Sequence, residues 1–144
     1  MLVRQILAMK GGNEIVTLPQ STLVSDAARL LSEKRIGAVV ISDDGETAAG
    51  ILSERDIVRE LGRRGPACLS DSVTDLMTSE LVSSAPDETA DSVMQKMSEG
   101  RFRHMPVTEG SKMVGLISIG DVVKARLSEL SMEKDALEGM IKGF

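Results

Sequence analysis

Residues 50–61 read GILSERDIVREL and residues 115–126 read GLISIGDVVKAR, so one pattern occurs twice, displaced by 65 positions. The similarity continues upstream, where VTLPQST at residues 16–22 aligns with VSSAPDET at residues 82–89. At the start of the copies, the aligned residues are Val3, Ile6 and Leu7 with Val73, Leu76 and Met77. A copy of about 60 residues buries little surface alone, so the duplication predicts two halves that pack against each other.

Each copy shows the same succession of hydrophobic periods. An extended piece near a proline comes first, at residues 14–18 and 81–84. A helical face follows in the second copy, with Thr89 as candidate N-cap, and consists of Ala90, Val93, Met94 and Met97. The matching face of the first copy is entered through Ser21 or Thr22 and consists of Leu23, Ala27, Leu30 and Leu31.

Two short strands and a second helix complete each copy. The strands are predicted at residues 38–42 and 50–52, then at 105–108 and 114–117, with closing helices from residues 57 and 122 onward. The order β-α-β-β-α predicts an α/β (α+β) fold of two pseudo-two-fold-related repeats packed together, each a small mixed sheet with helices on one face. The predicted ranges are 1–68 for the first repeat, 69–130 for the second and 131–144 for an extension of the C-terminal helix.

The predicted C-terminal helix carries an apolar seam. Its residues follow a 4-3-7-4 spacing, with Lys134 at the missing heptad position: Val123, Leu127, Leu130, Leu137 and Ile141. Such a seam requires a partner surface. Two interpretations remain open, namely that the helix folds back onto its own domain or that it contacts another chain.

The composition excludes several classes of function. The 144 residues include 17 Lys or Arg against 22 Asp or Glu, no Trp or Tyr and two Phe, which disfavours nucleic-acid binding. One histidine, His104, and one cysteine, Cys68, exclude a Cys/His zinc cluster and leave little for nucleophilic catalysis. No apolar run approaches the roughly 18 residues of a membrane span, and with no signal peptide and a single cysteine we expect a cytoplasmic protein.

The chemistry is concentrated where a strand becomes a helix. Ser53 precedes Asp56 by three residues, and Ser118 precedes Asp121 in the same way. One interpretation is a capping box, in which hydroxyl and carboxylate satisfy the first amides of the helix. The other is a ligand site, because a carboxylate at a cleft can accept hydrogen bonds from both hydroxyls of a ribose, beside helix amides that favour phosphate.

An adenine ring requires an apolar slot beside such a corner. The strand at Val16 or Val82 and the residue Ile36 or Phe102 are the candidates for its walls. Backbone groups near Thr17 or Ser83 are the candidates for contacts with the edge of the base.

From Val3 to about Leu127 the chain resembles tandem cystathionine-β-synthase (CBS) domains. The features that carry the resemblance are the two Ser-x-x-Asp junctions, the order of elements, and the strands RIGAVVI and RFRHMPV. The resemblance implies a Bateman module of the small stand-alone bacterial type, commonly a homodimer, whose clefts bind adenosine-containing ligands. AMP, ADP, ATP and NAD(H) are the implied ligands, with no metal required. It also implies that Asp56 and Asp121 hold ribose, that Ser53 and Ser118 lie near phosphate or ribose, and that the backbone near Thr17 and Ser83 approaches adenine.

The two clefts are expected to differ. The second copy carries Arg101, Arg103 and His104 where the first has Arg35, Gly37 and Ala38, and Gly120 where the first has Arg55. In the family the Arg103 and His104 positions point toward phosphate, so we expect the second cleft to be the better phosphate binder. Arg55 is either a phosphate contact or a solvated side chain, and His104 is either a phosphate contact or a strand-edge residue bonded to backbone.

The sequence therefore predicts a non-enzymatic sensor of adenine nucleotides that acts on an unidentified effector protein. The alternative is a structural interaction module with vestigial clefts that docks a partner through its C-terminal helix. Nucleotide hydrolysis is disfavoured because the chain has no Walker-type loop and no metal cluster.

Overall fold

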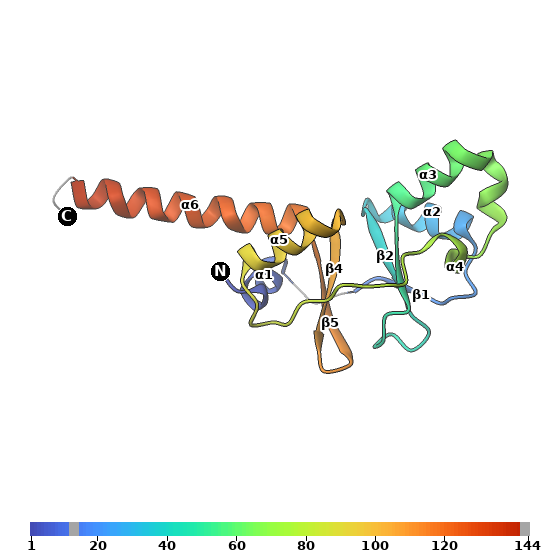
Figure 1. Ribbon diagram of the computed structural model, residues 1–144, viewed down its shortest axis with the longest axis horizontal. Helices are drawn as coiled ribbons and strands as arrows, with labels where there is room; N and C mark the ends of the chain where they lie inside the picture. The colour runs from blue at the N-terminus through green and yellow to red at the C-terminus, as the bar shows by residue number, and fades with distance from the viewer. Residues whose placement is uncertain (12–14, 142–144) are drawn as a thin grey trace.

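The computed structural model describes residues 1–11 and 15–141, which form two similar halves and one long helix (Figure 1). The first half contains β1 (Thr17–Leu18), α2 (Val24–Lys34), β2 (Ala38–Ile41), β3 (Gly50–Ser53) and α3 (Glu54–Arg64), followed by a 3₁₀ helix (Gly65–Ser70). The second half contains α5 (Ala90–Gly100), β4 (His104–Glu109), β5 (Lys112–Ser118) and α6 (Ile119–Ile141). Two short helices, α1 (Val3–Met9) and α4 (Val73–Leu76), lead into the two halves.

Both sheets are small, as predicted, but only the first is mixed; the second is a two-stranded antiparallel sheet with one isolated parallel bridge beside it. In the first half β1 pairs with β2 in parallel and β2 pairs with β3 antiparallel, with Ala38 opposite Ser53. In the second half β4 and β5 are antiparallel, and Ser84 forms a parallel bridge with Val107 in place of β1. Of the extended piece predicted at residues 14–18, Glu14 lies outside the described residues.

The amphipathic helices begin in two different ways. Thr89 caps α5 as predicted, because its Oγ1 accepts a hydrogen bond from the Ser92 amide at 3.1 Å. The prediction that Ser21 or Thr22 caps α2 is wrong: Leu23 is the N-cap and makes no side-chain cap bond. A side-chain cap is not needed there, because the first helical amide, that of Val24, donates to the carbonyl of Asp71 at 2.9 Å.

The two leading helices are exchanged between the halves. Helix α1 comes before the first half in sequence, but its buried Val3, Ile6 and Leu7 belong to the core of the second half. Helix α4 comes before the second half, but Val73 is buried in the core of the first. Matching backbone bonds hold both helices in place, since Val3 donates to Glu88 O and Val73 donates to Thr22 O, each at 2.9 Å. Each half is therefore completed by the other half's leading segment.

A third apolar cluster joins the halves. Ala38, Val40 and Ile51 from the first half are buried against Met113 from the second. The Met113 amide also donates to the carbonyl of Glu46 at 2.8 Å, which connects β5 to the loop between β2 and β3. The two halves thus share a core, as the duplication predicts.

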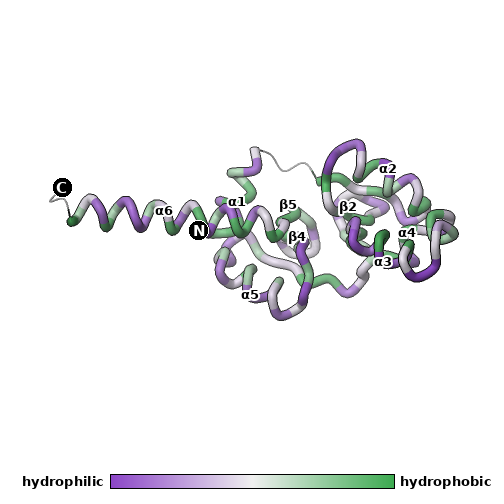
Figure 2. The backbone as a smooth tube through the Cα atoms, turned by 90° about the horizontal axis from the view of Figure 1, so that it is seen from above, coloured by the Kyte–Doolittle hydropathy of each residue, from purple (hydrophilic) through white to green (hydrophobic). Residues whose placement is uncertain are grey.

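Helix α6 starts against the second half and then projects away from it (Figure 1). Val122 and Ala125 are buried, and Arg126 pairs with Asp91 on α5 at 2.9 Å. Apolar residues nonetheless recur along the whole helix (Figure 2), and their side chains are exposed at 59% for Leu137 and 84% for Ile141. The seam therefore does not fold back onto the chain's own domain within the described part, residues 119–141. Nor does any helix of the described residues have the length and apolar content to cross a membrane.

Candidate functional site

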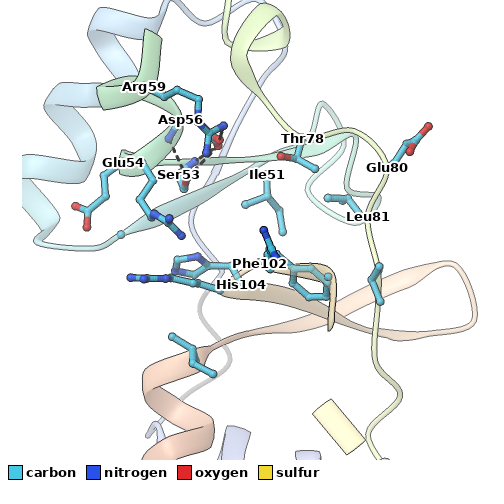
Figure 3. Close-up of a pocket in the computed structure, with 17 residues that line it drawn as sticks. Ile51, Ser53, Glu54, Asp56, Arg59, Thr78, Glu80, Leu81, Phe102 and His104 are labelled. Atoms are coloured by element: carbon cyan, nitrogen blue, oxygen red, sulfur yellow. Dashed lines mark hydrogen bonds and ion pairs between the residues drawn. The ribbon is translucent and has the colours of Figure 1, made fainter. Parts of the chain in front are cut away.

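A cavity of about 600 Å³ lies between the two halves (Figure 3). One wall is the junction of β3 and α3, and the opposite wall is the turn from α5 into β4. The segment after α4 closes a third side. The lining residues are Gly37, Ile51, Ser53, Glu54, Arg55, Asp56, Arg59, Thr78, Glu80, Leu81, Val82, Gly100, Arg101, Phe102, Arg103, His104 and Ile119.

The Ser53–Asp56 junction is a capping box. Asp56 Oδ2 accepts hydrogen bonds from the Ser53 amide at 2.9 Å and from Ser53 Oγ at 3.0 Å, while the Asp56 amide donates to Ser53 Oγ at 3.2 Å. The capping interpretation is therefore correct. The same carboxylate also lines the cavity, and its Oδ1 lies 3.6 Å from Arg59 Nη1, beyond hydrogen-bond distance. One oxygen serves the helix, and among the described residues Oδ1 makes only the long ion pair with Arg59.

The opposite wall carries an aromatic ring and two guanidinium groups. Arg101 ends α5 in the left-handed conformation, with φ of 56°, and this turn brings Arg101, Phe102 and Arg103 to the cavity. The ring of Phe102 packs so close to Gly100 that a Cβ on that glycine would lie 2.3 Å from Phe102 Cε1. A larger residue at this position would force the ring of Phe102 to move, so Gly100 allows the ring to lie where it does.

Apolar groups and charges divide the cavity into regions of different chemistry. Ile51 and Leu81 provide aliphatic surface on the side of Phe102 (Figure 3), and Val82 also lines the cavity. The charged groups at the remaining edges are four arginines, two glutamates and one aspartate: Arg55, Arg59, Arg101, Arg103, Glu54, Glu80 and Asp56. A planar apolar group, a hydroxylated group and an anion therefore each have a complementary wall.

His104 lies where the halves meet. A Cβ on Gly37 of the first half would lie 3.6 Å from its Nε2, although His104 itself begins β4 of the second half. Burial lowers the pKa of His104 below its usual value, and Lys10 and Arg103 lower it further, while Asp121 and Glu54 act in the opposite direction. The imidazole is neutral at pH 7 and faces the cavity.

The second junction makes the same local bonds in different surroundings. Asp121 Oδ2 accepts from the Ser118 amide at 2.9 Å, and the Asp121 amide donates to Ser118 Oγ at 3.1 Å. The same Oδ2 also lies 2.9 Å from Lys10 Nζ. Burial alone would raise the pKa of Asp121, but the Ser118 amide and Lys10 outweigh it and lower that pKa.

The cavity brings together residues from both copies, which differs from the grouping by copy expected from the sequence. Arg103 and His104, expected beside Asp121, line the same cavity as Asp56. The other candidates that meet there are Ser53, Arg55, Val82 and Phe102. Ser118, Gly120 and Asp121 line neither this cavity nor a shallower depression of about 530 Å³ beside α2.

The remaining candidates lie elsewhere. Ile36 lines the shallower depression together with Arg35 and Gly37. Val16 and Thr17 are half-buried at the start of the first sheet, where Val16 packs against the core, and Ser83 is exposed.

Sequence reasoning missed several lining residues. Arg59 stands three residues after Asp56 on α3, and this helical spacing was a usable signal. Thr78, Glu80 and Leu81 come from the segment after α4, and no local pattern placed that segment beside the first half. As for metals, nowhere in residues 1–11 and 15–141 do three or more His, Cys, Asp or Glu side chains gather to hold an ion.

Comparison with known proteins agrees with the duplicated fold. A family model described as CBS domain matches residues 3–63 and 73–128. The crystal structure of the CBS-domain containing protein ATU1752 from Agrobacterium tumefaciens has 41% sequence identity and a TM-score of 0.83, and covers 88% of this chain and 99% of that one. The CBS domain protein PAE2072 from Pyrobaculum aerophilum, complexed with AMP, has a TM-score of 0.77 at 24% identity over 92% of this chain and 99% of its own.

A curated relative is similar over most of the chain. The mitochondrial CBS domain-containing protein CBSX3 of Arabidopsis thaliana is 37% identical over 124 residues, which make up 83% of this chain. The matched part is 60% of that relative, so the chain spans less than two thirds of its length.

Proposed function

The chain belongs to the CBS-domain family, and on that premise we propose that it is a non-catalytic regulatory module which binds an adenosine-containing nucleotide between its two halves. The observation that carries the proposal is the cavity in which Asp56 of one half faces Arg103 and His104 of the other. AMP, ADP, ATP and NAD(H) are the candidate ligands. The AMP complex of PAE2072, a protein of the same fold, makes AMP the first to test.

Each part of the nucleotide has a proposed place. Adenine packs between Phe102 and the aliphatic side chains Ile51 and Val82. Ribose donates its hydroxyls to Asp56 Oδ1, which is the oxygen that the helix cap leaves free. Phosphate lies toward Arg103 and His104, because guanidinium groups bind phosphate through paired N–H donors.

The signal follows from the position of the cavity. Its walls come from both halves, so a ligand that contacts both binds best at one relative position of the halves. A ligand shifts a conformational equilibrium by the difference between its affinities for the two states. The mechanism requires no covalent bond of the nucleotide to be broken. The free energy available to act on an effector protein is the difference between the two binding free energies.

Thermal unfolding in the presence of a nucleotide panel tests the proposal. A ligand at 100 times its Kd stabilises the folded protein by about 2.7 kcal/mol, so AMP, ADP, ATP, NAD and NADH are each measured for a rise in Tm. Asp56→Asn keeps the size of the side chain and is expected to abolish the rise. Asp26→Asn, an exposed acid on α2, is the matched control and keeps it. If no adenosine compound raises Tm, the proposal is wrong.

A second candidate function is a structural interaction module that docks a partner through α6. The exposed apolar stripe of Leu127, Leu130, Leu137 and Ile141 favours it. Capture of a partner that is unchanged by AMP and by Asp56→Asn would support this function over nucleotide sensing. If capture of the partner depends on AMP, the chain has both functions, and α6 is the element through which nucleotide binding affects the partner.

We further propose that the module is a cytoplasmic homodimer in which the stripe on α6 is the contact between copies. Light scattering of the purified chain measures its mass, and Leu130→Glu with Leu137→Glu is expected to reduce a dimer to a monomer. Asp135→Lys with Ala136→Glu changes exposed positions of α6 outside the seam and serves as the control. A dimer that survives the leucine substitutions has its contact elsewhere.

A further inference from the structure

The two strand–helix corners differ in the cation that their carboxylate meets. Asp56 Oδ1 lies 3.6 Å from Arg59 Nη1, whose side chain is 68% exposed. Asp121 Oδ2 lies 2.9 Å from Lys10 Nζ, which also donates to the carbonyl of Leu116 at 2.8 Å. The first contact is loose and solvated, whereas the second is a hydrogen-bonded ion pair anchored to β5.

The exchange of leading helices places Lys10 at this corner. Lys10 is the C-cap of α1, and the buried residues Ile6 and Leu7 fix that helix in the core of the second half. The ammonium therefore reaches Asp121 from a rigid support that lies far away in sequence. Two acceptors, Asp121 Oδ2 and the carbonyl of Leu116, hold the ammonium of Lys10.

The segment after α4 brings an acid, and no cation, to the cavity at the other corner. Its lining residues are Thr78, Glu80, Leu81 and Val82. Glu80 lines the cavity at Asp56, and its carboxylate points outward, away from Asp56 (Figure 3). Two carboxylates cannot form an ion pair, so Glu80 does not occupy the corner at Asp56. Lys10, in contrast, occupies the corner at Asp121.

We infer that Lys10 closes the Asp121 corner to adenosine ligands, so that the chain binds one nucleotide, at the Asp56 corner. This inference rests on the proposed function. A ribose at Asp121 would have to displace the Lys10 ammonium, whose opposite charge attracts the carboxylate in addition to the hydrogen bond, whereas ribose hydroxyls carry no charge. It would also leave the Lys10 ammonium without its partner. Lys10 is thus a specificity-determining residue that sets the number of sites, and removal of its charge opens a second one.

Calorimetric titration with AMP tests the inference. The wild-type chain is expected to bind one AMP, and Lys10→Ala two. Lys10→Arg keeps a cation and is expected to bind one. Adding Asp121→Asn to Lys10→Ala is expected to return the count to one, since it removes the ribose acceptor. Lys112→Ala, an exposed lysine paired loosely with Glu46, is the control for loss of a positive charge.

The possible results separate this inference from the proposed function. Two AMP per wild-type chain, or one per Lys10→Ala chain, overturns the inference and leaves nucleotide binding intact. No AMP bound by any variant overturns the proposed function and the inference together. Lys10→Gln repeats the measurement without truncating the side chain, and far-UV circular dichroism of both variants confirms that α1 remains folded.

Discussion

Leu7 lies directly against Gly115, so that a Cβ on the glycine would come within 2.7 Å of Leu7 Cδ2. The other half repeats this relationship, because a Cβ on Gly50 would lie 2.4 Å from Met77 Sδ. Gly50 and Gly115 are the first residues of the duplicated stretch, and Leu7 of α1 aligns with Met77, the residue that follows α4. The absence of a side chain at these glycines is what allows each exchanged helix to lie on the opposite sheet.

Gly115→Val is therefore expected to destabilise the fold. The added side chain must displace Leu7 or move α1, and overpacking of a core costs about 1–3 kcal/mol. Chemical denaturation followed by circular dichroism measures the free energy of unfolding. Gly139→Ala is the control: nothing lies within 4 Å of its Cβ position on α6, and alanine is favoured over glycine in a helix by about 1 kcal/mol. Equal stability of Gly115→Val and wild type would contradict the packing described here.

Ser53→Ala is expected to lower the free energy of unfolding by about 1 kcal/mol. The substitution removes the hydroxyl that accepts from the Asp56 amide and donates to Asp56 Oδ2. Ser21→Ala, at an exposed position where we had expected a cap, is predicted to leave stability unchanged. The pair is compared by urea denaturation, and equal losses from both would show that the hydroxyl of Ser53 is not used as a cap.

AMP affinity is expected to rise as pH falls from 7 toward 5.5. Because the pKa of His104 lies below its usual value, the free protein holds the ring neutral at pH 7, and a bound phosphate favours the protonated ring. Binding then takes up a proton, which strengthens it in acid. The charged groups that act on the ring are Asp121, Lys10, Glu54 and Arg103.

The control for the pH effect is His104→Gln, titrated over the same range. A phosphate group itself gains a proton near pH 6, and this contribution is common to both proteins. Only the difference between the two profiles reports on His104. The same lowered pKa predicts that the ligand-free fold loses stability as pH falls below about 6.5, since the unfolded chain then binds the proton more readily. Parallel binding profiles would exclude His104 from the phosphate contact.

Arg103→Ala is expected to weaken AMP binding and to leave adenosine binding unchanged. A hydrogen bond to a charged group contributes about 1.5–3 kcal/mol, so the loss is roughly 10-fold to 150-fold for AMP. Adenosine lacks the phosphate and provides the comparison within one variant. Arg29→Ala, on the exposed face of α2, controls for the change in net charge. Equal losses for both ligands would place Arg103 beside the base or the sugar instead.

At a protein concentration where light scattering detects only monomer, removal of residues 131–141 is expected to change the free energy of unfolding by less than about 1 kcal/mol. Nearly all of these residues are exposed, and surface positions contribute little to stability. AMP binding is expected to be unaffected, because α6 contributes only Ile119 to the cavity. A large loss of stability in thermal unfolding of the monomer would mean that the end of α6 packs on the chain's own domain.

Local sequence signals predict the fold well. The duplicated stretch, the cap at Thr89 and the periodic faces of α2 and α5 follow from spacing alone, because each depends on residues within a few turns of one another. The start of α2 does not, since its first amide is satisfied by the carbonyl of Asp71 from a distant segment. Local pattern contains no information about such a partner.

The set of residues that line the cavity is harder to predict from sequence, for the same reason. Ser53 and Asp56 are recognisable as a motif, but their companions Arg103 and His104 come from the other copy. Grouping by copy assumes that each repeat folds on itself. The packing of the two sheets across the shared core determines which residues meet at the cavity. Val40, Ile51 and Met113 make this contact, and it places the β3–α3 junction opposite the turn from α5 into β4.

The exchanged leading helices suggest how the chain behaves when it is divided. A break near residue 70 gives two fragments, each carrying the short helix that the other one lacks. Neither fragment can seal its own apolar face, but together they hold every piece of both cores. Such fragments are suited to a split reporter, because each supplies the helix that the other needs. Any molecule that contacts both halves would strengthen their reassembly.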